Sequence, residues 1–180
     1  SPVNLNTTYS YRVVAVTAGG PANSNVVQIL TPPLAPSLTA VYQPRLMALL
    51  TWTNVANETG YLVQRINGDV TTDFTFAADV TTFTDTGLAF DGQYVYQVYA
   101  FNASGSSPVS NLVTVDAPPF APNNLAATYQ SGVQLTWFDN SEVETSFSIY
   151  RCSGSTTCIP SPYQTTGALT TGIGTVSYLD

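Results

Sequence analysis

Apolar and polar residues alternate with a period of two along much of this chain. Within residues 9–16, one face of the predicted strand carries Tyr9, Tyr11, Val13 and Ala15. Residues 94–100 repeat the pattern, and the matching face carries Tyr94, Tyr96, Val98 and Ala100. Alternation of this kind in aromatic and β-branched residues is typical of β-strands with one buried face. Helix signals are nearly absent, so we predict an all-β fold.

Each alternating strand is followed by a turn, a second apolar run and a proline-rich linker. The linkers are residues 32–36 and 118–122, so the pattern recurs after roughly 86 residues. The triplet Leu-Thr-Trp follows each linker, at 50–52 and at 135–137. Short strands separated by turn signals at this spacing are typical of β-sandwiches. The sequence therefore predicts repeated sandwich modules.

The repeated unit resembles a fibronectin type III domain. Trp52 and Trp137 stand at the position of the family's core tryptophan, after a proline-rich start. Tyr94 and Tyr9 match its corner tyrosine, and residues 100–110 match its Ala-x-Asn-x-x-Gly-x-Ser-x-x-Ser ending. The resemblance implies antiparallel seven-stranded sandwiches, with these four aromatic residues in the structural core. It also implies an extracellular or cell-surface protein whose modules serve as spacers, adhesive elements or ligand-binding units.

The resemblance divides the chain into one complete and two partial modules. We expect residues 33–118 to hold all seven strands and residues 119–180 to hold strands A to E of a further module. Residues 1–32 then supply the last two strands, F and G. In the complete module, nine residues separate Asp85 from Tyr94.

The same spacing reappears when copies are placed head to tail. If Asp180 of one copy runs into Ser1 of the next, Tyr9 again follows after nine residues. We therefore expect residues 1–32 to complete residues 119–180 of another copy. Three arrangements stay open: one repeat of a longer covalent array, separate subunits joined by donor-strand complementation, or a fragment of a linear multi-module protein. The first two predict a filament, because a head-to-tail contact that does not close grows indefinitely.

Composition narrows the classes of function. The chain has four arginines, no lysine, no histidine and a net charge of −7. Nucleic-acid binding needs clustered cations, so we exclude nucleic acid as a partner. No apolar run is long enough for a membrane-spanning helix, so we expect no membrane insertion. Without histidine, and with Glu58 and Glu144 in different modules, we predict no catalytic residue, no metal site and no cofactor.

Four groups of residues carry weaker signals. The acidic loop 139–144 has oxygen ligands for calcium, but it lacks the spacing of an EF-hand loop and we interpret it as a solvated loop. Exposed tyrosines are candidates for stacking on cell-surface glycans, although we favour ordinary packing; they are Tyr42, Tyr129 and Tyr163. Cys152 and Cys158 favour a disulfide that closes a short hairpin loop, with two free thiols as the alternative. Asn-x-Ser/Thr sequons in predicted loops are candidates for N-glycosylation or chance matches; they are Asn6, Asn57 and Asn102.

The sequence as a whole predicts a non-enzymatic structural subunit or repeat of an extracellular filament or surface fibre. Its expected partners are other copies of itself. The alternative is a spacer or carbohydrate-binding accessory region of a secreted polysaccharide-degrading enzyme or adhesin. A receptor-type binding module is a third option, and it should have a defined protein ligand and be monomeric.

Overall fold

A computed structural model describes residues 2–152, 164–165 and 172–180. These residues contain strands, turns and no helix, and all the paired strands are antiparallel, as predicted. No helix that could cross a membrane is found in this part of the chain. The chain divides into two compact units. Unit 1 comprises residues 1–88 and 93–116, and unit 2 comprises residues 89–92 and 117–180.

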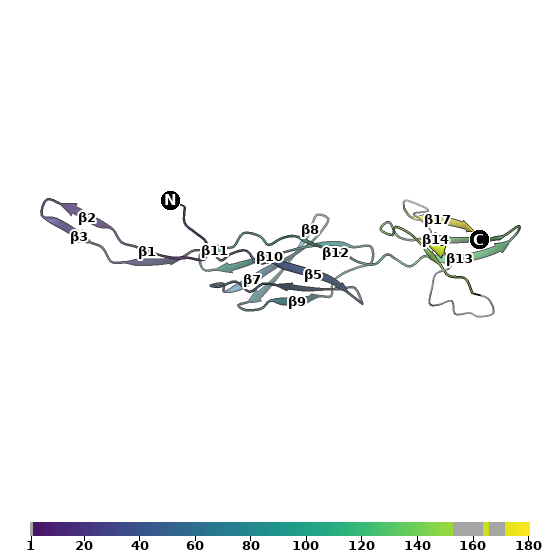
Figure 1. Ribbon diagram of the computed structural model, residues 1–180, viewed down its shortest axis with the longest axis horizontal. Coiled ribbons are helices and arrows are strands. Elements are labelled where there is room, and N and C mark those ends of the chain that lie inside the picture. The colour runs from purple at the N-terminus through teal and green to yellow at the C-terminus, as the bar shows by residue number, and fades with distance from the viewer. Residues whose placement is uncertain (1, 153–163, 166–171) are drawn as a thin grey trace. The chain divides into compact units, whose positions relative to one another are not determined.

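Most of unit 1 is a two-sheet sandwich (Figure 1). One sheet has the order β5-β6-β9, with strands β5 (Leu38–Gln43), β6 (Met47–Trp52) and β9 (Thr82–Asp85). The other has the order β8-β7-β10-β12, with β7 (Gly60–Asn67), β8 (Val70–Ala77), β10 (Gln93–Asn102) and β12 (Val113–Asp116). The short strand β11 (Gly105–Ser106) pairs with the end of β10. Apart from the short β11, these strands form a seven-stranded antiparallel sandwich, in agreement with the predicted fold class.

The core of this sandwich lies between the two sheets. Tyr94, Tyr96, Val98 and Ala100 are all buried on one face of β10, which confirms the predicted alternation. Trp52 is buried as well, and its ring centroid lies 5.7 Å from those of Tyr61 and Phe76. Such aromatic pairs add to the area-dependent gain from burial.

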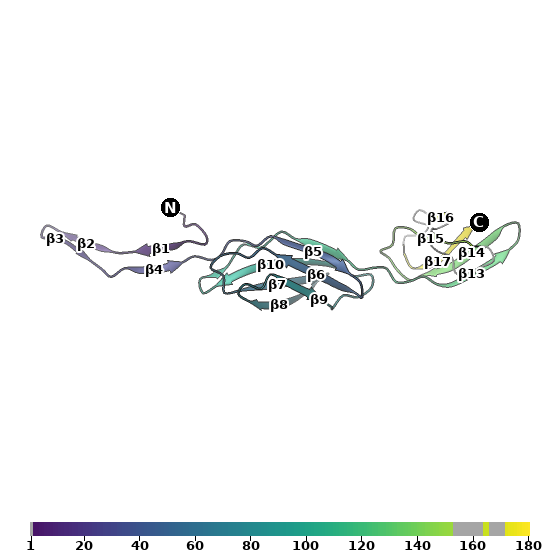
Figure 2. The same ribbon diagram turned by 60° about the horizontal axis from the view of Figure 1, so that its bottom comes forward.

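A second part of unit 1 is a β-ribbon that belongs to neither of these two sheets (Figure 2). Strand β1 (Thr8–Tyr11) pairs with β4 (Val27–Leu30), and β2 (Val14–Thr17) pairs with β3 (Gly20–Asn23). We call residues 8–30 the hairpin. The sequence predicts one strand over residues 9–16, and this is wrong. The strand breaks at residues 12 and 13, where the Val13 amide donates to the Ser24 hydroxyl. The equivalent strand β10 runs through the same contact because it also pairs with β7 along its other edge.

Unit 2 contains a smaller set of strands. Strands β13 (Asn123–Tyr129), β14 (Val133–Asp139) and β17 (Gly174–Leu179) form a three-stranded sheet, and β15 (Ser148–Ile149) pairs with β16 (Gln164–Thr165). The order β13-β14-β17 matches β5-β6-β9 in unit 1. Trp137 and Val176 are the buried apolar residues of its three-stranded sheet. The contacts group the hairpin with residues 33–88, whereas the sequence analysis treats residues 1–32 as a domain apart; those domain boundaries stay a prediction.

Candidate functional site

A buried charge cluster joins the two sheets of the sandwich in unit 1. The Arg65 guanidinium donates to both carboxylate oxygens of Asp85, at 3.0 and 2.9 Å. The Tyr96 hydroxyl donates to Asp85 Oδ2 at 2.8 Å, and the Gly87 amide donates to Oδ1 at 2.8 Å. The guanidinium carbon also lies 5.7 Å from the ring centroid of Tyr94. Arg65 and Tyr96 belong to one sheet and Asp85 to the other, so the cluster is a clasp between sheets.

The clasp depends on complete pairing. A buried carboxylate without partners carries a large desolvation cost, whereas paired and hydrogen-bonded ions are tolerated in a protein interior. Burial is the main cause that raises the pKa of Tyr96 above its ordinary value of 10.0, and the hydrogen bond to Asp85 acts in the same direction. Tyr96 therefore stays a neutral donor throughout the physiological pH range.

Unit 2 repeats half of this clasp. The Arg151 guanidinium donates to both oxygens of Asp180, at 3.2 and 3.1 Å. The side chain of Arg151 is 57% exposed, whereas that of Arg65 is 18% exposed. In the described part of unit 2, no strand takes the place that β10 occupies beside β7.

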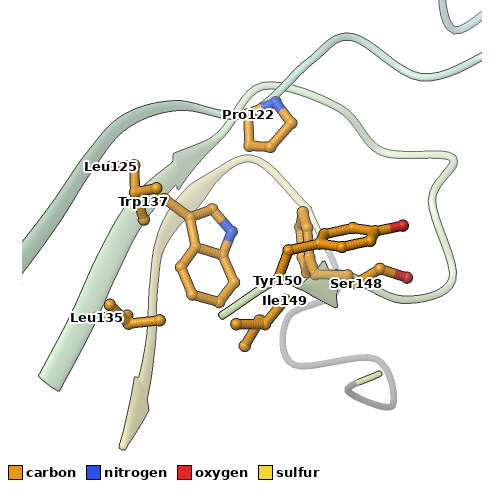
Figure 3. A pocket seen from close by; sticks show the side chains of 8 residues that line it. Pro122, Leu125, Leu135, Trp137, Ser148, Ile149 and Tyr150 are labelled. Carbon is orange, nitrogen blue, oxygen red and sulfur yellow. The ribbon is translucent and has the colours of Figure 1, made fainter. Parts of the chain in front are cut away.

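An apolar cavity of about 340 Å³ lies in unit 2. It is lined by Pro122, Leu125, Leu135, Trp137, Phe147, Ser148, Ile149 and Tyr150. Figure 3 shows the Trp137 indole between the leucines on one side and Ile149 and Tyr150 on the other. Leu125 is 71% exposed, whereas its counterpart Leu38 in unit 1 is 2% exposed. Open apolar surface of this kind marks interaction sites in soluble proteins.

The hairpin exposes apolar side chains whose counterparts in the complete sandwich are buried. Tyr11 is 49% exposed and Val13 is 73% exposed, while their counterparts Tyr96 and Val98 are fully buried. Further large apolar side chains of the hairpin are also exposed, namely Val14, Val16, Val26, Val27 and Ile29. The hairpin thus carries a row of apolar side chains that no part of the described structure covers fully.

In the complete sandwich, the last two strands F and G are β10 and β12. The hairpin has the same register as this pair. Tyr9 lies opposite Ile29 as Tyr94 lies opposite Val115. An equivalent hydrogen bond to a serine occurs in both pairs. The Val13 amide donates to Ser24 Oγ at 2.9 Å in the hairpin, and the Val98 amide donates to Ser110 Oγ at 2.9 Å in the complete sandwich. The hairpin therefore has the strand register of an F–G pair.

The predicted glycosylation sites lie together at the base of the hairpin. Asn57 Nδ2 donates to Asn6 Oδ1 at 2.7 Å, and Asn102 Nδ2 donates to the carbonyl oxygens of Thr31 and Asn57, both at 3.1 Å. Asn6 and Asn57 lie in turns, as predicted, but Asn102 is the last residue of β10 and not a loop residue. A glycan on Nδ2 of Asn57 or Asn102 would replace these contacts, so modification stays a prediction.

The acidic loop of unit 2 is not solvated throughout, and that part of the interpretation is wrong. Asp139 and Ser141 are buried, because the Ser141 amide donates to Asp139 Oδ1 and the Ser141 hydroxyl donates to Asp91 at 2.6 Å. Glu142 and Val143 are exposed. No group of three or more potential metal ligands occurs in the residues that the structure describes.

The remaining candidates are placed as follows. Trp52, Trp137 and Tyr94 are buried, and Tyr9 is half-buried on the hairpin. Tyr42 on β5 and Tyr129 on β13 are exposed, but they belong to different units. Tyr163 and Cys158 lie outside the described residues, so the pairing of Cys152 with Cys158 stays a prediction.

Sequence reasoning missed the residues that hold the F–G pair in place. Asn111 accepts from the Leu38 amide at 2.8 Å and donates to the Leu38 carbonyl at 2.9 Å. The spacing of Asp85 and Tyr94 along the chain does not indicate that Arg65 is the partner of Asp85. The recurrence of this pair as Arg151 and Asp180 was the signal that could have found it.

The chain was compared with protein-family models, curated proteins and solved structures. No protein-family model and no curated protein matches the chain. Among solved structures, it is similar to a Fn3-like protein from Clostridium thermocellum, with 27% identity, 51% of this chain and 99% of that chain covered, and a TM-score of 0.42. The FN5 domain of Drosophila Lar is 23% identical over 49% of this chain and 99% of that chain, with a TM-score of 0.43. These neighbours are fibronectin type III domains.

A longer similarity is found with the FN1–FN3 domains of chicken CNTN1. It covers 97% of this chain and 67% of that chain at 16% identity, with a TM-score of 0.44. The strand order and register described above define an all-β fold of antiparallel sheets, and the solved structures that it is similar to are fibronectin type III domains.

Proposed function

We propose that this chain is a non-enzymatic structural segment of an extracellular filament or surface fibre whose copies associate head to tail. The hairpin of one copy inserts into the apolar cavity of unit 2 in another copy and takes the place that β10 and β12 have in the complete sandwich. The observation that carries the proposal is this match: an exposed apolar hairpin with F–G register, and an open cavity lined by the counterparts of buried core residues.

The apolar contact supplies the main driving force. In the complete sandwich, Val98 lies opposite Val63 and Ala100 opposite Tyr61, and all four are fully buried. By the same register, Val13 of the hairpin lies opposite Ile149 of the other copy. Full burial of each such aliphatic side chain contributes about 1.5 to 3 kcal/mol. Main-chain hydrogen bonds along the added strands fix the direction of insertion.

The same contact serves either covalent or non-covalent assembly. In a covalent array, the hairpin belongs to the following repeat, and in donor-strand complementation it belongs to a separate subunit. Both arrangements need the hairpin and the cavity to bind each other, so the isolated chain should self-associate in either case. Growth in one direction without closure gives a filament.

Sedimentation velocity and electron microscopy of the purified chain test this proposal. We expect concentration-dependent polymers for the unchanged chain. Val13→Asp on the hairpin and Leu125→Asp in the cavity should each prevent polymer growth, because each buries an unpaired carboxylate at the contact. Both residues are exposed in the single chain, so the fold of each variant should survive. Val70→Asp, at an exposed position of β8, is the matched control.

Mixing the two variants gives a sharper result. The Leu125→Asp chain keeps an intact hairpin and acts as the donor copy, and the Val13→Asp chain keeps an intact cavity and acts as the acceptor copy. An equimolar mixture should form a one-to-one heterodimer and stop, since the other two contact surfaces are blocked. An unchanged chain that stays monomeric at all accessible concentrations overturns the proposal.

A monomer would favour the alternative of a spacer or carbohydrate-binding accessory module. Among the aromatic residues that the structure describes, Tyr129 on β13 is the most exposed. Glycan-array binding that is lost in Tyr129→Ala would support this alternative.

A further inference from the structure

The clasp of the complete sandwich has counterparts in unit 2 and in the hairpin, and these indicate which residues would meet between copies. Asp85 at the end of β9 is held by Arg65 from β7 and by Tyr96 from β10, and the Tyr94 ring lies beside the Arg65 guanidinium. The clasp therefore connects the F strand to the opposite sheet. It adds directional, charge-assisted hydrogen bonds to the apolar packing between the two sheets.

Unit 2 holds the acceptor half of the clasp in the same place. Asp180 lies opposite Val133 through two backbone hydrogen bonds of 3.2 and 2.9 Å, just as Asp85 lies opposite Ala48. Arg151 donates to the Asp180 carboxylate as Arg65 does to Asp85. An ionised carboxylate at this point can accept a further, charge-assisted hydrogen bond.

The hairpin carries the donor half. Tyr11 lies opposite Val27 in the hairpin, as Tyr96 lies opposite Val113 in the complete sandwich. Among the described contacts, the Tyr11 hydroxyl has no hydrogen-bond partner, and its side chain is about half exposed. Tyr96 lies opposite Arg65 in the complete sandwich, so the same register places Tyr11 opposite Arg151 of another copy.

We infer that Tyr11 of one copy donates a hydrogen bond from its hydroxyl to the Asp180 carboxylate of another copy, with the Tyr9 ring against Arg151. This inference rests on the head-to-tail association proposed above, and it names the residues that set the register and selectivity of that contact. A hairpin without a phenol at this position would leave the carboxylate one donor short on burial, and this would disfavour foreign strands.

A second polar contact of the complete sandwich also has a counterpart in the hairpin. In the complete sandwich, Asn111 follows Ser110 and binds both backbone groups of Leu38. In the hairpin, Asn25 follows Ser24, whose hydroxyl donates to the Asn25 carbonyl at 2.7 Å as Ser110 does to Asn111 at 2.8 Å. Leu125 is the counterpart of Leu38. The register of β13 shifts between Asn123 and Ala126, so we expect the Asn25 amide of one copy to meet the edge of β13 near Leu125 rather than both backbone groups of Leu125.

The donor and acceptor copies defined above allow a double-mutant cycle. Tyr11→Phe is placed in the donor copy and Asp180→Asn in the acceptor copy, and calorimetry measures the dissociation constant of each of the four heterodimers. We expect Tyr11→Phe to weaken association about ten- to one-hundred-fold when Asp180 is present, the range for a lost hydrogen bond to a charged group. With Asp180→Asn in place, Tyr11→Phe should have a several-fold smaller effect, because the two groups are coupled. Tyr42→Phe, at an exposed position of unit 1, is the control and should leave the constant unchanged.

The outcomes separate this inference from the proposed function. If heterodimers form but the effects of Tyr11→Phe and Asp180→Asn simply add, the association stands and the inferred clasp is wrong. If no heterodimer forms between donor and acceptor copies, both are wrong. Circular dichroism of each variant checks that the change lies in the contact and not in the fold.

Discussion

The Tyr96 hydroxyl donates a 2.8 Å hydrogen bond to Asp85, and this bond joins strands of opposite sheets. It completes the shell of donors that also includes Arg65 and the Gly87 amide. Both Tyr96 and Asp85 are almost fully buried, so neither can exchange its partner for water. The stability of the sandwich therefore depends on this pair.

Tyr96→Phe should destabilise the complete sandwich by about 1.5 to 3 kcal/mol, the usual value for a lost hydrogen bond to a charged group. The phenyl ring keeps the packing, so the loss reports on the hydroxyl. Urea denaturation followed by circular dichroism measures it. The control is Tyr99→Phe, whose hydroxyl accepts a 3.3 Å bond from Gln97 on the other face of β10. Equal stability of both variants would contradict the prediction.

The stability of the sandwich should fall as the pH rises above about 10. The folded-state pKa of Tyr96 is raised above its ordinary value of 10.0, chiefly by burial, and burial also raises the pKa of Tyr61. Above pH 10 the unfolded chain releases these protons and the folded chain retains them, so the free energy of unfolding decreases with pH, by up to about 1.4 kcal/mol per pH unit for each tyrosine. Denaturation between pH 8 and pH 11 (roughly the span around a normal tyrosine) measures this slope. Tyr96→Phe should show a shallower decline than the unchanged chain, and identical slopes would count against the raised pKa.

Asn111→Ala should cost about 1 to 2 kcal/mol, because it removes two hydrogen bonds to the backbone of Leu38. These bonds tie the segment before β12 to the edge strand β5. Hydrogen exchange should show faster exchange of the Leu38 amide in this variant. Asn67→Ala, at an exposed position at the end of β7, is the control and should change neither measurement.

Gly60→Ala should destabilise the sandwich by about 1 to 3 kcal/mol through overpacking. An added Cβ would lie 2.5 Å from the Phe76 carbonyl oxygen and 2.6 Å from Cζ of Phe101. Thermal unfolding measures the loss. Gly19→Ala in the hairpin turn meets its nearest neighbour, Thr17 Oγ1, at 3.6 Å and should change stability by less than about 0.5 kcal/mol. An unchanged melting temperature for Gly60→Ala would contradict the prediction, because the backbone at Phe76 would then have to move at no cost.

The local pattern predicted the strands and their buried faces well. Alternation over residues 94–100 placed four side chains on one face, and all four are buried. This works because the side-chain period of a strand is a local property of the backbone. The same pattern over residues 9–16 overstated the strand, since a continuous ladder also needs a partner along its whole length.

The sequence by itself determined the all-β class, the recurring unit and the buried faces, because alternation, turns and proline linkers act over short distances. Tertiary structure alone decided the partners of those faces. Asp85 meets Arg65 and Tyr96 only when two sheets close on each other, and Asn111 reaches Leu38 across the edge of the sandwich. Tertiary structure also decided that the cavity beside Trp137 is open and that one face of the hairpin is exposed. A strand pattern specifies which side chains are apolar, but not which surface covers them.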